Sequence, residues 1–66
     1  MTVIFERREY KHVDGFLKIN YKKMIFEKVT KIEMSDKALF IEYFCCDGKE
    51  SLFSRVDEIK NLIVEE

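Results

Sequence analysis

Glycine occurs at only two positions of this chain, and both follow an aspartate: Asp14-Gly15 and Asp47-Gly48. An Asp-Gly pair supplies the positive backbone dihedral angles that a two-residue hairpin loop requires. Proline is absent, so the remaining turns must rely on polar residues such as Ser35-Asp36-Lys37. Apolar or alternating runs flank both Asp-Gly pairs, and this arrangement predicts antiparallel strands joined by tight turns.

The residues between these turns have the period of β-strands. Residues 16–22 alternate, with Leu17, Ile19 and Tyr21 on one face and Lys18, Asn20 and Lys22 on the other. This period of two predicts a strand. Residues 39–46 are almost continuously apolar, which is typical of a strand that is covered on both faces or lies at an interface. Within that strand, the thiols of Cys45 and Cys46 should point to opposite faces, with one of them packed inward.

Residues 22–34 allow two interpretations. Ile25, Val29 and Ile32 have the spacing of an amphipathic helix. However, the segment lacks an N-cap residue and is rich in side chains that prefer strands. We therefore predict a long strand with a bulge near Lys28, and the alternative is a short helix around residues 22–33.

The composition also favours β-structure. Ile, Val, Phe and Tyr total 21 residues, whereas Ala and Leu total 5. Residues 55–59 resemble a single helical or 3₁₀ turn before a closing strand at 61–64. We predict one mostly all-β domain over residues 1–66, either a small antiparallel barrel of SH3-like or Sm-like type or an open meander. Barrel closure would remove exposed sheet edges.

The length of the chain indicates that it needs a partner. Domains below roughly 70–80 residues usually add disulfides, a metal or an oligomer to a small core. Two adjacent cysteines do not cross-link distant segments, and one histidine does not complete a structural zinc site. We therefore expect a homo-oligomer, a dimer or higher, and no cofactor or metal. Residues 1–33 carry a net charge of +3 and residues 34–66 a net charge of −4. Because the two halves can interleave in a barrel, we interpret this split as solvated strand faces, and the alternative is a dipolar molecule that docks onto a charged partner.

No catalytic motif is recognisable. His12 is the only histidine, and the chain contains no G-x-S-x-G elbow or glycine-rich phosphate loop. The acids near residues 47–50 and 57–58 lie in predicted turns, where solvated carboxylates are common. The sequence therefore predicts a protein that is not an enzyme.

Two sets of residues are candidates for binding. Phe40, Phe44 and Phe53, if they point outward, would form an apolar patch that the Asp47-Gly48 hairpin could carry into a protein partner. The alternative is a nucleotide or single-stranded nucleic-acid site that combines aromatic stacking with cations. Its candidate residues are Lys18, Asn20, Lys22 and Tyr10. The net charge of −1 counts against this alternative, because nucleic-acid-binding domains are usually basic.

The C-terminal half has a recurrent pattern: Val29-Thr30-Lys31-Ile32, Leu39-Phe40-Ile41-Glu42-Tyr43, Asp47-Gly48, Phe53 and Glu58–Val64. This pattern resembles small β-barrel accessory proteins encoded by phages and other mobile elements. The resemblance implies a protein that inhibits a host enzyme or a defence factor stoichiometrically, or one that sequesters a nucleotide signal. No apolar run reaches the about 18 residues of a transmembrane helix, and charge comes too early for a signal peptide, so we expect a cytoplasmic protein without membrane contact.

Overall fold

The computed structural model describes residues 1–66 and is almost entirely β-structure, as predicted. The elements are β1 (Thr2–Val13), β2 (Phe16–Phe26), β3 (Val29–Met34), β4 (Ala38–Cys45), β5 (Gly48–Arg55), the 3₁₀ turn η1 (Val56–Glu58) and β6 (Ile59–Glu65). The single turn before the last strand confirms the prediction for residues 55–59.

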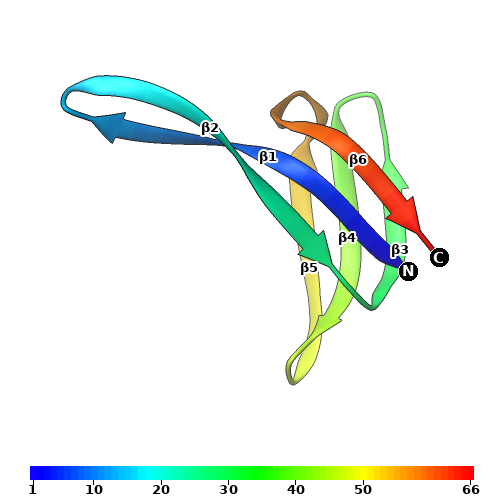
Figure 1. The fold of residues 1–66 in the computed structure, drawn as a ribbon. Coiled ribbons are helices and arrows are strands. Elements are labelled where there is room, and N and C mark those ends of the chain that lie inside the picture. The colour runs from blue at the N-terminus through cyan, green and yellow to red at the C-terminus, as the bar shows by residue number, and fades with distance from the viewer.

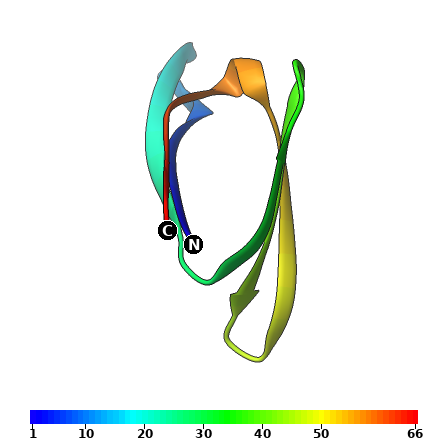
Figure 2. The ribbon, with the colours of Figure 1, turned by 90° about the vertical axis from the view of Figure 1, so that its right-hand side faces the viewer.

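The strands form two antiparallel three-stranded sheets, with the orders β2-β1-β6 and β3-β4-β5. We call them the first and second sheet. They face each other as two layers, joined at one end by η1 and at the other by the β2–β3 connection (Figure 2). No strand of one sheet pairs with a strand of the other. One backbone hydrogen bond, from the amide of Val29 to the carbonyl of Met1 at 2.9 Å, ties the layers at the β2–β3 end. The closed barrel is therefore not confirmed, and the architecture is a small two-layer sandwich.

The core lies between the layers and is small. It contains six buried hydrophobic residues: Val3, Phe5, Phe26, Val29, Leu39 and Ile41. The rings of Phe5 and Phe26 stack with centroids 5.7 Å apart, and Tyr43 packs against Phe26 at 4.9 Å. Phe5 and Phe26 belong to the first sheet and Tyr43 to the second, so the contact between Phe26 and Tyr43 joins the two layers.

The β1–β2 hairpin extends well beyond the sandwich (Figure 1). Strand β6 pairs with β1 only as far as Arg7, so the rest of the hairpin is a ribbon of two strands. We call residues 7–22 the arm. Its loop is the predicted Asp14-Gly15 pair, and both residues have positive φ angles, 52° and 81°. The arm positions most of the candidate binding residues away from the core.

Residues 22–34 are β-structure without a helix, as the strand interpretation predicts, but they form two strands rather than one bulged strand. β2 continues to Phe26, the chain reverses at Glu27-Lys28, and β3 begins at Val29. Lys28 has a φ angle of 55°, a left-handed conformation in the turn between the two strands, and β2 and β3 belong to different sheets. The helical spacing was misleading because Ile25 lies on the outer face of its sheet, whereas Val29 is buried. A register irregularity does occur nearby, between Val29 and Lys31.

The second hairpin is shifted by one residue from the prediction. Its two-residue loop is Cys46-Asp47, and Gly48 already belongs to β5, where it pairs with Cys45. Cys46 therefore lies in the turn rather than in the strand. This hairpin also extends past the end of the first sheet (Figure 1), and both thiols are exposed. The prediction that one cysteine packs inward is wrong, because no layer covers this end of β4.

Candidate functional site

The arm has two faces of opposite character. The two residues of each antiparallel cross-strand pair lie on the same face, and successive pairs alternate between faces. One face, the basic face, carries the pairs Arg7/Lys22, Glu9/Asn20, Lys11/Lys18 and Val13/Phe16. The other, the apolar face, carries Arg8/Tyr21, Tyr10/Ile19 and His12/Leu17.

The apolar face is uncovered. Ile19 is 57% exposed, and Tyr10 and Leu17 are exposed to a similar degree. The same outer surface continues along the first sheet, where Ile4 pairs with Ile25 on one side and Ile63 on the other. The predicted alternation of β2 is therefore confirmed, but the apolar side of the arm faces solvent rather than the core.

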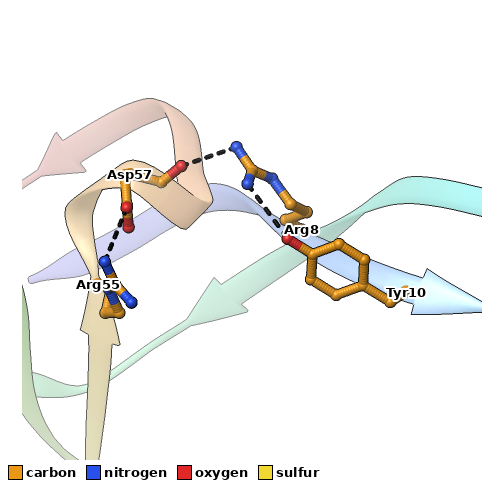
Figure 3. Close-up of polar contacts among 4 residues, drawn as sticks. All are labelled: Arg8, Tyr10, Arg55 and Asp57. Atoms are coloured by element: carbon orange, nitrogen blue, oxygen red, sulfur yellow. Dashed lines mark hydrogen bonds and ion pairs between the residues drawn. The ribbon is translucent and has the colours of Figure 1, made fainter.

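Polar contacts of Arg8 fasten the base of the arm to η1 (Figure 3). The Arg8 guanidinium donates to the hydroxyl of Tyr10 at 3.2 Å and to the carbonyl oxygen of Asp57 at 2.9 Å. The Asp57 carboxylate accepts from Arg55 at 3.0 Å. The hydrogen bonds with the hydroxyls of Tyr10 and Tyr21 raise the pKa of Arg8 further, so its side chain stays cationic. These contacts connect the arm to the turn that joins the two sheets.

Two further contacts stabilise the first sheet near the arm. The ammonium group of Lys60 lies over the ring of Tyr21, 3.8 Å from its centroid, a cation–π contact. The amide of Asn61 donates to the carboxylate of Glu6. The first contact links β6 to β2 across β1, and the second links β6 to β1, where the arm leaves the sandwich.

The predicted protein-binding phenylalanines gather on one surface. Phe40 and Phe53 are a cross-strand pair on the outer side of the second sheet, and Phe44 follows on the same side of β4. Phe53 is 64% exposed, Phe44 is also exposed and Phe40 is half-buried. We call these three residues the phenylalanine face. An ion pair between Lys49 and Glu42, at 3.1 Å, lies on the same side.

The predicted hairpin residues lie next to this face. Asp47 is in the loop between β4 and β5, and Gly48 is the first residue of β5. Cys45 and Cys46 are at the same tip, with their sulfur atoms 3.6 Å apart. The hydrogen bond with Cys46 raises the pKa of the Cys45 thiol, so Cys45 stays protonated at neutral pH.

The predicted nucleic-acid residues are brought together only in part. Lys18, Asn20 and Lys22 share the basic face, but Tyr10 lies on the opposite face. Arg7 and Lys11, which pair with Lys22 and Lys18, are not among the residues predicted for this site. The sequence does indicate their positions, because a two-residue loop at Asp14-Gly15 fixes the register of the whole hairpin and therefore the partner of each residue.

The remaining reactive side chains are not assembled into a site. His12 is near the tip of the arm, whereas the two cysteines are at the tip of the other hairpin, which extends in a different direction (Figure 1). No group of three or more His, Cys, Asp or Glu side chains is placed to hold a metal ion. The structure also contains no helix long and apolar enough to cross a membrane.

No protein-family model, curated protein or solved structure matches the chain. The resemblance to accessory proteins of mobile elements therefore stays a prediction.

Proposed function

We propose that the protein is a non-catalytic module that acts by stoichiometric protein–protein interaction through the phenylalanine face. The observation that supports this most strongly is that more large hydrophobic residues are exposed than are buried in the core. Six hydrophobic residues are buried in the core, whereas thirteen large hydrophobic residues are exposed. Contiguous exposed apolar surface on a small protein usually marks an interface. As the sequence resemblance implies, the partner would be a host or defence factor that the module inhibits.

The chemistry of the phenylalanine face fits a protein partner. Aromatic side chains are enriched at the centres of protein interfaces, and a few of them carry most of the binding energy. Burying one phenylalanine side chain contributes roughly 1.5–3 kcal/mol. Glu42, which is ion-paired with Lys49, lies in the row between Phe44 and the Phe40/Phe53 pair. A surface that combines aromatic side chains with charges of both signs is suited to a protein rather than to a polyanion.

A pair of phenylalanine substitutions tests the proposal. Phe53→Glu and Phe44→Glu each place a charge at the centre of the proposed interface. The matched control is Phe16→Glu, because Phe16 is the most exposed phenylalanine and lies at the tip of the arm. The wild type and the three variants are used as baits in an extract of the producing cells, and the captured protein is then purified and titrated by calorimetry.

The expected result is a complex of fixed stoichiometry that the Phe16→Glu variant still forms. Phe53→Glu should weaken it by about 2 kcal/mol or more, roughly 30-fold in Kd. If both Phe53→Glu and Phe44→Glu bind the purified partner as tightly as the wild type, the phenylalanine face is not the interface.

A further inference from the structure

We propose that the basic face of the arm binds double-stranded DNA, with the arm entering the major groove as a two-stranded ribbon. This inference does not depend on the proposed function, because the phenylalanine face belongs to the second sheet and the arm is a projection of the first. It differs from the single-stranded site predicted from the sequence in its ligand, and it adds Arg7 and Lys11 and leaves out Tyr10.

The first argument is that the basic face contains like charges in direct opposition. Arg7 is paired with Lys22, and Lys11 with Lys18. Directly opposed like charges destabilise an antiparallel ribbon. None of these four cations takes part in an ion pair, since the three ion pairs of the structure are Lys31–Glu33, Lys49–Glu42 and Arg55–Asp57. An anion that lies across each pair would convert this repulsion into attraction.

The spacing of the cations fits a DNA duplex. Arg7 and Lys11 are four positions apart along β1, which is about 14 Å in a strand. Two strands lie about 4.8 Å apart, and the major groove of B-DNA, about 12 Å wide, admits such a ribbon. Beyond Arg7, which pairs with β6, the arm projects past the sandwich (Figure 1), so this part of the ribbon is open to a ligand. The two cationic pairs are thus spaced to contact phosphates several nucleotides apart.

The groups between and beyond the cations are suited to base edges. Glu9 and Asn20 form the pair between the two cationic pairs. Asparagine can bond to adenine and a carboxylate can accept from cytosine in the major groove. At the tip, Phe16 is 75% exposed and, with Val13, offers an apolar contact for thymine methyl groups. The cations would position the arm, and these residues would touch the bases.

The arrangement of the aromatic residues disfavours other ligands. A single-strand site needs several aromatic rings beside the cations, but Tyr10 and Tyr21 are on the opposite face. Double-stranded RNA has a major groove too narrow for side chains to read. An anionic membrane would take up the apolar face and leave the lysines on its solvent side.

The charge distribution of the whole chain also favours binding by the arm. Residues 7–22 contain five Lys or Arg and two acids, for a net charge of +3, while the rest of the chain has a net charge of −4. Phosphates repel the acidic body, so the protein would approach a polyanion with its arm first. An overall negative protein can therefore carry a basic binding element.

The test uses fluorescence anisotropy with a mixed-sequence DNA duplex of about 20 base pairs. The variants are Lys18→Glu and Lys22→Glu, and the matched control is Lys37→Glu, which makes the same charge change in the turn between β3 and β4. Melting curves accompany each titration. Lys18→Glu and Lys22→Glu replace an opposed like-charge pair by an opposite-charge pair, so a loss of binding with unchanged or higher melting temperature cannot reflect unfolding.

We expect the wild type to bind the duplex with a logarithmic salt slope of about −3.6, the value for four neutralised phosphates. Each arm substitution should lower the affinity about tenfold and reduce the slope by about 1 or more, and Lys37→Glu should leave both within twofold. The inference is overturned if the duplex does not bind, if Lys37→Glu has the same effect as the arm substitutions, or if the single strand of the same sequence or vesicles with anionic lipid bind more tightly than the duplex.

Discussion

Cys46 adopts a backbone conformation that its side chain disfavours. Its φ angle is 53°, in the left-handed region where a Cβ atom is crowded. We therefore expect Cys46→Gly to raise the free energy of unfolding by about 0.5–1 kcal/mol, measured by urea denaturation. Gly48→Ala is the control, because Gly48 has no positive φ and a Cβ there would meet no atom within 4 Å. If Cys46→Gly lowers the free energy of unfolding, or if Gly48→Ala lowers it strongly, the two-residue loop is Asp47-Gly48, as the sequence predicts, rather than Cys46-Asp47.

The same turn shows what residue identity could and could not predict. Asp14-Gly15 and Asp47-Gly48 are the same dipeptide, but only the first forms the loop itself. In the second hairpin the pairing of Phe40 with Phe53 and of Ile41 with Leu52 sets the register, and the loop falls one residue earlier. A dipeptide locates a turn within a residue or so, and the packing of the flanking strands decides the final position.

At the scale of an element, the period of β2 was predictable and its surroundings were not. Alternation places Leu17 and Ile19 on one face in the sequence and in the structure. Alternation does not indicate whether other residues cover that face, and in this structure the face is exposed. The break within residues 22–34 could not be predicted for a related reason. Phe26 and Val29 both enter the core, but from different sheets, and no periodicity within one segment can report a change of sheet.

The arm should be locally weakened by its like-charge pairs. Lys18→Glu places a carboxylate opposite Lys11, and such a pair contributes roughly 0.2–1 kcal/mol relative to the repulsive one. We expect slower hydrogen exchange of the amides in residues 8–21, measured by NMR, with Lys18→Gln giving an intermediate effect. Lys37→Glu should leave these amides unchanged. Equal exchange in all four proteins would show that the opposed lysines do not influence the ribbon.

At the scale of the molecule, the core is too small for the apolar surface that the chain carries. The outer surface of the first sheet extends from Ile25, Ile4 and Ile63 to Ile19 and Leu17 without being covered. An isolated ribbon of two strands is marginally stable in water, and the arm has no third strand beyond Arg7. The length of the chain alone predicted this shortage, although not where the uncovered surface would lie.

A second copy of the chain is the partner that best fits the apolar face. Arg8 already bonds to Tyr10 and Asp57 of its own chain, and the ammonium group of Lys60 already lies over the ring of Tyr21. Two apolar faces can therefore meet about a two-fold axis with both of these cations already in contact with their own chain. The basic faces would then point outward, free to bind DNA.

We expect a dimer by sedimentation equilibrium and a melting temperature that rises with protein concentration. Ile19→Lys should give a monomer whose melting temperature is lower and independent of concentration. Met34→Lys, which changes an exposed residue of β3, should remain dimeric. A wild-type monomer with a concentration-independent melting temperature would exclude this assembly and would require the arm to be stable without a covering partner.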